Sequence, residues 1–261
     1  MKITVNSPSY KRPAEVKVLE YLPFCKIWVD ESEAEDYKLN NPEAEIVSCP
    51  RGIQGNTARI RNYIIKTEIQ NGADVVVLVD DDLHYIARFN IDGNFGYVKT
   101  RLKTEDFMAF VEKYSIMAED LGAKYWGIAP NPDPMVYRHF KPFNTICFVG
   151  GPFQCFLKGN RCWHDERLPL KEDYDMTLQQ INKERVVLRV NYYHYYCEQS
   201  TNKGGCATYR NLIREKEQFE LLQKKWGGEI VKTDPGARKG MKKARVNLDY
   251  NPMLKIPIKG V

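Results

Sequence analysis

The segment from Val75 to Asp82 constrains the fold more than any other part of the chain. Its five apolar residues, Val75-Val76-Val77-Leu78-Val79, are mostly β-branched and predict a strand buried on both faces. Three aspartates follow at once. Strands of this kind belong to sheets covered by helices, and such sheets bind ligands at the carboxyl ends of their strands. We therefore expect an α/β fold with its functional site at these aspartates.

The aspartate triplet favours a divalent cation. Adjacent carboxylates repel one another in a partly desolvated site unless a cation or a set of hydrogen-bond donors lies among them. Side chains alternate along an extended chain, so Asp80 and Asp82 are expected to face one ligand while Asp81 points elsewhere. The alternative is a solvated loop or a helix N-cap, for which one aspartate is enough.

Short apolar runs alternate with helical patterns in the first half of the chain, which favours a mixed, mostly parallel sheet flanked by helices. The patterns predict strands at 3–5, 26–29, 45–48, 75–79, 125–129, 146–149, 153–157 and 186–196. They predict helices at 14–21, 31–41, 58–70, 104–121 and 209–225. We expect one catalytic domain over residues 1–225 and an extension over 226–261.

The extension is basic. From Trp226 to Val261 it carries eight Lys and Arg against three Asp and Glu, a balance of +5 that equals the net charge of the whole chain. Clustered cations near glycines suit contacts to a polyanion, and the alternative is a solvated terminus that keeps the protein soluble. The predicted nucleic-acid contacts are Arg238, Lys239, Lys242, Lys243 and Arg245.

Composition excludes several classes of protein. No apolar stretch approaches the roughly 20 residues that span a bilayer, and the amino terminus turns polar too early for a signal peptide. The seven cysteines are scattered and form no Cys-x-x-Cys pair, which argues against structural zinc and a redox dithiol. We expect reduced thiols and a cytoplasmic protein.

Two segments offer groups that suit a nucleotide. Ser7-Pro8-Ser9-Tyr10-Lys11-Arg12 follows the first strand with hydroxyls, backbone donors and two cations, although it is also an ordinary strand-to-helix turn. The second segment, Gly55 to Asn62, opens a helix, and helix N-termini attract phosphate. Arg59 and Arg61 in it do not share a helix face, so we expect one to reach the ligand and the other to lie on the surface.

The second half of the chain offers further candidates. Glu172 and Asp173 could act as a general base, or could complement the dipole of the helix that follows them. His194 lies in the aromatic run Asn191-Tyr192-Tyr193-His194-Tyr195-Tyr196, where it is either a metal ligand or a hydrogen-bonded core residue. The tyrosines of this run alternate across two faces, and one pair could stack bases or sugars.

Together these segments resemble the GT-A fold glycosyltransferases over about residues 1–196. The resemblance is carried by the nucleotide loop Ser7 to Arg12, Asp30 after the second strand, Gly55 to Asn62, the metal triplet Asp80 to Asp82, Gly150-Gly151, and Glu172-Asp173. The Asp-Asp-Asp-Leu strand end, the Asn-x-Gly-Gly loop and the basic tail are similar to the phage TET-associated glycosyltransferases, which are related to the base J glucosyltransferases.

This resemblance implies a nucleotide-sugar donor, most simply a UDP-sugar, and a 5-hydroxymethylpyrimidine in DNA as the acceptor. It implies that Mn²⁺ or Mg²⁺ is held by Asp82 with Asp80, to which His194 is added as a third candidate ligand, and that Asp173 is the base, with Glu172 beside it. The expected donor contacts are Ser7, Pro8, Tyr10, Arg12, Asp30, Arg59, Asp80 and Asp81.

Three other functions remain open from the sequence. The first is a GT-A enzyme that glycosylates a glycan, lipid or protein, with the same metal site and an incidental tail. The second is a nucleotidyltransferase or metal nuclease, which also uses paired carboxylates but usually holds two cations. The third is a DNA-binding module without catalysis, which leaves the aspartate strand unexplained.

Overall fold

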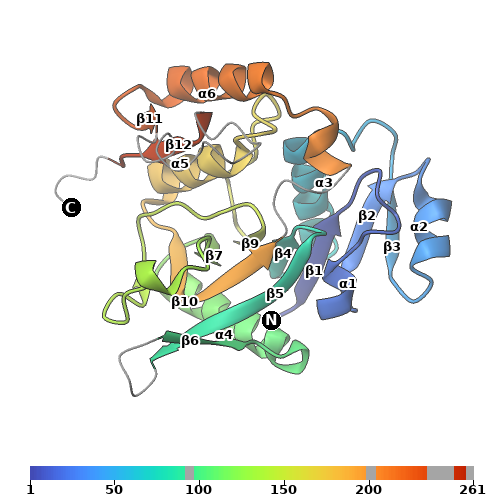
Figure 1. The fold of residues 1–261 in the computed structure, drawn as a ribbon, viewed down its shortest axis with the longest axis horizontal. Helices are drawn as coiled ribbons and strands as arrows, with labels where there is room; N and C mark the ends of the chain where they lie inside the picture. Colours follow the sequence, from blue (N-terminus) through green and yellow to red (C-terminus); the bar gives the residue numbers. More distant parts are fainter. Residues whose placement is uncertain (92–96, 198–203, 234–249, 257–261) are drawn as a thin grey trace.

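A computed structural model describes residues 1–91, 97–197, 204–233 and 250–256. A central mixed sheet has the strand order β3-β2-β1-β4-β9-β7-β10-β5-β6, and β8 pairs with β10 beside this path (Figure 1). Its strands are β1 Ile3–Pro8, β2 Lys26–Asp30, β3 Ile46–Cys49, β4 Val75–Val79, β5 Leu83–Ile91, β6 Tyr97–Arg101, β7 Tyr125–Ala129, β8 Phe143–Asn144, β9 Phe153–Leu157 and β10 Leu188–Cys197.

The helices cover both faces of this sheet. They are α1 Val18–Tyr21, α2 Ala34–Asn40, α3 Thr57–Gln70, α4 Phe107–Asp120, α5 Glu172–Glu184 and α6 Leu212–Trp226. Short 3-10 helices occur at η1 Thr104–Asp106, η2 Pro134–Val136 and η3 Gly205–Thr208. A separate two-stranded sheet pairs β11 Val231–Thr233 with β12 Pro252–Leu254.

The sheet has a parallel half and a largely antiparallel half. Strands β3, β2, β1 and β4 run parallel, as the alternating strand and helix patterns predict. Beyond β4 the pairings are antiparallel except between β7 and β10. The predicted α/β class with a mixed sheet flanked by helices is therefore confirmed.

Strand β4 is buried on both faces, as its sequence predicts. Val75, Val77 and Val79 pack in one apolar cluster with side chains from α1, α2 and α4. Val76 and Leu78 face the other way, into a second cluster with side chains from α3 and α5. This central place in the molecule fixes the position of the aspartates that follow β4.

Most predicted elements are present, two predictions are wrong, and one pair of strands was not predicted. Residues 146–149 form no strand, and β8 lies just before them and pairs with β10. The helix predicted from residue 14 is only the single turn α1, because the preceding chain runs as a loop against the aspartate segment, where the Val18 amide donates to the Asp81 carbonyl at 2.9 Å. The β5–β6 hairpin was not predicted.

Helix α6 and strand β11 pack against α5. Phe219 and Leu222 of α6 share an apolar cluster with Leu178 of α5 and with Val231 of β11. The indole of Trp226 donates to Asp175 at 2.7 Å. The five tail cations predicted to contact nucleic acid lie outside the described residues. In the part of the chain that is described, no helix has both the length and the apolar character to cross a membrane.

Candidate active site

Four segments meet at the carboxyl end of β4. The aspartate triplet leaves the strand, α3 supplies Arg61, the Gly150-Gly151-Pro152 turn precedes β9, and α5 begins with Glu172 and Asp173. The turn is fixed to the triplet because the Asp80 amide donates to the Pro152 carbonyl at 3.3 Å. The site therefore lies at the boundary between the parallel and antiparallel halves of the sheet.

Asp81 points into the protein. Its side chain is 1% exposed, and its carboxylate accepts hydrogen bonds from Arg12 Nε at 2.7 Å and from the Ser9 hydroxyl. Arg12 Nη2 completes a two-nitrogen ion pair with it. Burial acts to raise the pKa of Asp81 and outweighs these partners, which act to lower it. Asp81 points inward, as the alternation of side chains predicts, and its contacts with Ser9 and Arg12 link the loop after β1 to the end of β4.

This arrangement turns the Asp81 carboxylate away from the surface, whereas the predicted donor contact of Arg12, which is 13% exposed, stays a prediction. Their charged groups are paired with each other, and the Asp81 carboxylate is buried away from any ligand. Pattern reading assigned both residues to the donor because both follow sheet strands. Sequence alone does not distinguish two residues that form a buried salt bridge from two residues that contact a ligand.

Asp80 and Asp82 lie on the other side of the strand end. Asp80 is 30% exposed, whereas Asp82 is half-buried beside the end of β10. The Cys197 thiol is hydrogen-bonded to Asp82, and burial together with the charges of Asp82 and Asp80 raises the pKa of that thiol. The two carboxylates that the alternation predicted to act together are thus separated from the buried Asp81.

Asp80 and Asp82 remain the predicted ligands of a divalent cation. Among the residues that the structure describes, no three His, Cys, Asp or Glu side chains gather as a metal-binding cluster. Mg²⁺ in nucleotide enzymes is usually held by one or two carboxylates, with substrate phosphates and waters as its remaining ligands. Asp80 and Asp82 match that smaller ligand set.

His194 is not part of this set. It is fully buried, its Nδ1 lies 3.3 Å from the Tyr195 carbonyl, and its ring packs 4.7 Å from Phe89 and 6.5 Å from Tyr85. Burial lowers its pKa. The geometry supports the alternative of a core histidine, and the prediction that it ligates the metal is corrected.

Arg61 links the aspartates to the acidic end of α5. Its side chain is 3% exposed, and its Nη2 lies 2.5 Å from Asp80 Oδ1. Its Nη1 donates to Gln154 Oε1 at 2.9 Å and lies 3.7 Å from Glu172 Oε1. Burial acts to lower the pKa of Arg61, but the charges of Asp80, Glu172 and Asp173 raise it overall. Arg61 therefore stays charged at the centre of the site.

Arg59 lies on the surface instead. It is 40% exposed and pairs with Glu166 at 3.0 Å. The structure brings Arg61 to the aspartates and leaves Arg59, the predicted donor contact, on the surface, as expected for two residues that do not share a helix face. The Asn56 side chain caps α3 by accepting a hydrogen bond from the Arg59 amide at 3.1 Å.

Glu172 and Asp173 are adjacent acidic residues in the first turn of α5. Burial raises the pKa of Glu172 to about 8 against the opposing charge of Arg61. Burial also raises the pKa of Asp173, although Arg61 and the Gly151 and Tyr174 amides act to lower it. These amides donate to the Asp173 oxygens at 3.1 and 2.8 Å. A carboxyl pair with raised pKa values can exchange a proton near neutral pH.

The two glycines before β9 leave space that a side chain would fill. A Cβ on Gly151 would lie 3.1 Å from Arg61 Nη1 and 3.5 Å from Asp173 Oδ2. A Cβ on Gly150 would collide with the Tyr195 hydroxyl. The backbone can therefore approach Arg61 and Asp173 closely, and the Gly-Gly signal in the sequence marks this approach.

The predicted nucleotide loop is well ordered. The Gln54 side chain donates to the Ser9 carbonyl at 3.1 Å and to the Trp28 carbonyl at 2.8 Å, which fixes the loop against β2. Ser7 is buried, Pro8 ends β1, and Tyr10 is half-buried. The contacts of Ser7, Pro8 and Tyr10 with a donor stay predictions.

The segment that begins at Gly204 lies on this loop. The Gly205 amide donates to the Tyr10 carbonyl at 2.8 Å, and a Cβ on Gly204 would come within 2.8 Å of the same oxygen. Gly204 has a φ of +92°, which favours glycine. The Asn-x-Gly-Gly motif therefore ends in two glycines that pack against the nucleotide loop.

Asp30 ends β2 at the same edge of the sheet. Its Oδ1 accepts from the Ser32 hydroxyl at 2.6 Å and from the Ser32 amide at 3.0 Å. Burial acts to raise its pKa, but the bonds from Ser32 and the Gly52 amide lower it overall, so the side chain is an anion at neutral pH. Its predicted contact with the donor stays a prediction.

The site thus combines the carboxylates that follow central strand β4 with an acidic pair at the start of α5. The model of the TET-Associated Glycosyltransferase family matches residues 24–205. The chain belongs to this family, and it is a glycosyltransferase. No curated protein matches it.

Solved structures show only distant likeness. A putative nucleotide-diphospho-sugar transferase from Desulfovibrio desulfuricans is 13% identical, with a TM-score of 0.42 over 85% of this chain and 97% of that one. A mannose-1-phosphate geranyltransferase from Thermus thermophilus is 11% identical, with a TM-score of 0.43 over 76% of each chain. A197 from STIV is 12% identical, with a TM-score of 0.40 over 78% of this chain and 89% of that one.

Proposed function

We propose that the protein transfers a sugar from a nucleoside diphosphate sugar to the hydroxyl of a 5-hydroxymethylpyrimidine in DNA, and that it requires a divalent metal. The observation that carries the proposal is the Arg61 bridge, which holds Asp80 near the acidic pair Glu172 and Asp173. A donor at the aspartates and an acceptor at the acidic pair would then meet within one site. Membership of the family supports DNA as the acceptor.

In the proposed reaction the acceptor hydroxyl oxygen forms a bond to the anomeric carbon of the sugar. The bond from that carbon to the diphosphate oxygen breaks, and the nucleoside diphosphate leaves with the electron pair. The hydroxyl proton passes to the carboxylate of Asp173, which the Gly151 and Tyr174 amides hold in place. Burial raises the pKa values of both Glu172 and Asp173, so this pair can take up a proton at a higher pH than ordinary carboxyl groups can.

Asp80 and Asp82 would hold the metal, which supplies neutralisation of charge on the leaving diphosphate when it is bound. Arg61 keeps Asp80 oriented and adds a fixed positive charge near the developing negative charge. An acceptor base in duplex DNA would have to leave the stack, at a cost of a few kcal/mol. Single-stranded DNA avoids that cost and is the better first substrate.

The test is transfer of radiolabelled sugar by the full chain with Mn²⁺, from a panel of nucleotide sugars that includes UDP-glucose. The acceptors are a hydroxymethylcytosine oligonucleotide, a hydroxymethyluracil oligonucleotide, an unmodified oligonucleotide and an oligosaccharide. We expect label only on hydroxymethylated DNA, and nucleoside diphosphate as the second product. Label on the oligosaccharide alone would refute the proposed acceptor. Release of pyrophosphate would refute the proposed reaction.

A further inference from the structure

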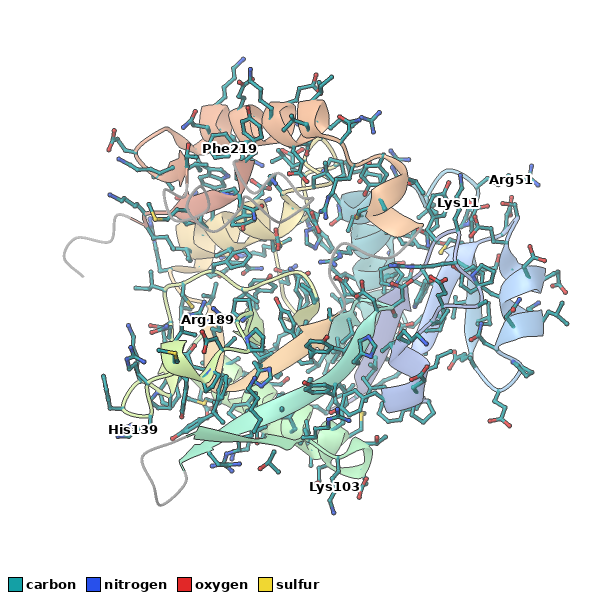
Figure 2. The ribbon with its side chains drawn as sticks, in the orientation of Figure 1. Lys11, Arg51, Lys103, His139, Arg189 and Phe219 are labelled. Carbon is teal, nitrogen blue, oxygen red and sulfur yellow. The ribbon has the colours of Figure 1, made fainter. Side chains whose placement is uncertain are left out.

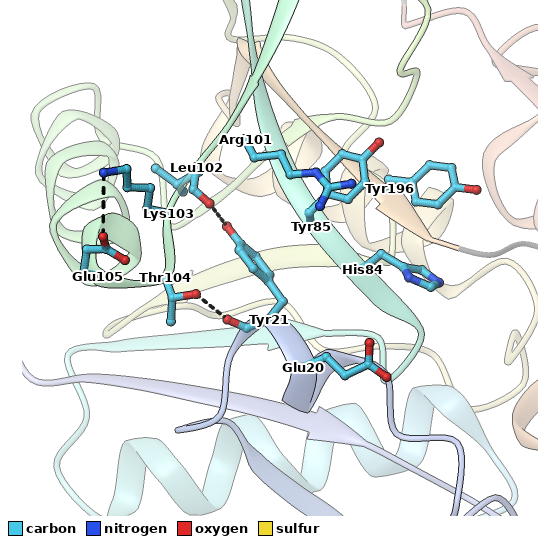
Figure 3. Close-up of a pocket in the computed structure, with 10 residues that line it drawn as sticks. All are labelled: Glu20, Tyr21, His84, Tyr85, Arg101, Leu102, Lys103, Thr104, Glu105 and Tyr196. Carbon is cyan, nitrogen blue, oxygen red and sulfur yellow. Dashed lines mark hydrogen bonds and ion pairs between the residues drawn. The ribbon is translucent and has the colours of Figure 1, made fainter.

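A groove of about 540 Å³ opens between α1, the β5–β6 hairpin and the end of β10 (Figure 3). The site described above does not use it. The residues on which the argument rests are Tyr21, His84, Tyr85, Arg101, Lys103 and Tyr196. Figure 2 shows Lys103 at the opposite end of the molecule from Phe219 on α6, so the groove is remote from the packing of the C-terminal helix.

Three side chains form a stack along one side of the groove. The Arg101 guanidinium lies 4.2 Å from the centre of the Tyr85 ring. The Tyr85 and Tyr196 rings are stacked with centres 5.2 Å apart and planes 14° apart. Strand register explains the stack, because Tyr196 is opposite Tyr85 and Arg101 is opposite Ala87, which shares a sheet face with Tyr85.

The outer member of the stack is exposed. Tyr196 keeps 42% of its surface accessible, although it is a large aromatic side chain already packed against Tyr85. The Tyr196 ring, which stacks on Tyr85, offers an aromatic surface on which any base can stack. Arg101, which is also exposed, places a positive charge at the other end of the stack.

The opposite wall is held in place by hydrogen bonds. The Tyr21 hydroxyl donates to the Leu102 carbonyl at 2.9 Å, and the Thr104 hydroxyl donates to the Tyr21 carbonyl at 2.8 Å (Figure 3). Tyr21 and Thr104 therefore connect α1 to the end of the hairpin. The groove is formed before any ligand binds, which reduces the entropy lost on binding.

The groove is lined by two acidic and two basic side chains, and of these four only Arg101 has no ion-pair partner among the described residues. Its two carboxylates are each paired with a lysine: Glu105 with Lys103 at 3.9 Å, and Glu20 with Lys17 at 3.1 Å. Arg101 takes part in neither pair. A ligand that combines flat rings with negative charge is therefore the best match to the exposed ring and the guanidinium.

Two residues of the groove are close in sequence to residues at the candidate active site. His84 lies two residues after Asp82, and Tyr196 directly precedes Cys197, whose thiol is hydrogen-bonded to Asp82. A polymer whose reacting unit lies at the aspartates can place its neighbouring units along this groove.

We propose that this groove binds the DNA strand next to the acceptor nucleotide, with a flanking base stacked on Tyr196 and a phosphate at Arg101. The inference rests on the proposed DNA acceptor. It adds a second, sequence-independent contact that lies outside the reacting centre and outside the basic tail.

The test measures binding of a fluorescent 12-nucleotide single strand to the full chain by anisotropy, alongside the same strand made abasic at every position. Tyr196→Ala should weaken binding of the normal strand by between about 5-fold and 100-fold, because stacking of one base is lost. It should leave the abasic strand unchanged. Arg101→Gln should weaken both strands and lower the salt slope by about 0.7.

Matched controls come from exposed residues away from the groove. Phe140→Ala removes a ring that is 75% exposed, and Lys38→Gln removes an exposed cation on α2. Neither should change the affinity beyond about 2-fold, the usual effect of a distant surface change. Tyr196→Phe keeps the ring and should bind as the wild type does, which separates stacking from any damage to the fold.

The outcomes distinguish this inference from the proposed function. If the wild type glycosylates hydroxymethylated DNA but Tyr196→Ala binds both strands normally, the groove assignment is wrong and the function stands. Equal weakening of the normal and abasic strands by Tyr196→Ala also overturns the assignment. If the wild type transfers sugar only to an acceptor other than DNA, the proposed function fails first, and the groove assignment fails with it.

Discussion

Replacing Arg61 tests whether one buried cation organises the site. Arg61→Met removes the charge but keeps much of the apolar volume, and leaves Asp80, Gln154 and Glu172 without their shared partner. Removing one partner of a buried ion pair typically costs about 3 to 5 kcal/mol. Asp80 is 30% exposed and can be rehydrated, and burial raises the pKa of Glu172 so that it can take up a proton. We therefore expect a loss of about 3 kcal/mol in the free energy of unfolding, the lower end of that range.

Arg59→Met is the matched control, because it removes the same side chain two residues away on the same helix. Arg59 is 40% exposed and its partner Glu166 is 51% exposed, so its ion pair contributes about 0 to 1 kcal/mol. Urea unfolding followed by tryptophan fluorescence measures both variants. Transfer assays in conditions where both are folded should show a loss on the order of a hundredfold for Arg61→Met, because the site is misplaced, and little change for Arg59→Met.

The pH profile gives an independent readout of the same residue. The Arg61 charge acts to lower the pKa values of Glu172 and Asp173, so its removal should raise both. The limb of the activity profile on which the base loses its proton should therefore move to higher pH in Arg61→Met. Equal stability, activity and pH profile in the two methionine variants would refute the central role of Arg61.

Four further changes test the remaining assignments. Asp82→Asn should keep the fold but abolish the Mn²⁺-dependent rise in melting temperature that a bound donor gives. Asp81→Asn should instead lower the free energy of unfolding by about 3 kcal/mol in urea, since buried Arg12 loses its anion. Asp173→Asn should lower kcat by about 10²- to 10⁴-fold at unchanged donor KM in steady-state assays. Glu172 should contribute stability that is lost as pH rises from 4.5 to about 8, because the unfolded chain ionises this residue before the folded chain does. Glu172→Gln should remove that part of the slope in urea titrations at several pH values.

The sequence predicts the parallel half of the fold well because its signals are local. The run of five apolar residues marks β4 within its true bounds, and the residues predicted at 125–129 are those of β7. The β5–β6 hairpin was not predicted, because the three aspartates directly before β5 favour a loop. The alternation from Leu83 to Phe89 is the signal that could have revealed β5.

The roles of charged residues are harder to predict than the elements that carry them. Arg59 and Arg61 follow the same helix cap, and only the packing of α3 on the sheet decides which one is buried. His194 illustrates the same limit, since a strand pattern cannot show which rings pack around it. Glu172 and Asp173 were predicted as site residues from the order of several motifs along the chain, because acidic residues in a first helical turn are common for other reasons.

The inward turn of Asp81 has a practical consequence for redesign of this enzyme. Because Asp81 holds Ser9 and Arg12 together, the loop after β1 and the end of β4 are expected to shift as one rigid piece. A library that aims at a new sugar donor should keep these three residues fixed and vary exposed Lys11 between them. Randomising the whole loop would mostly yield unfolded chains, and their loss of activity would be mistaken for a change of preference.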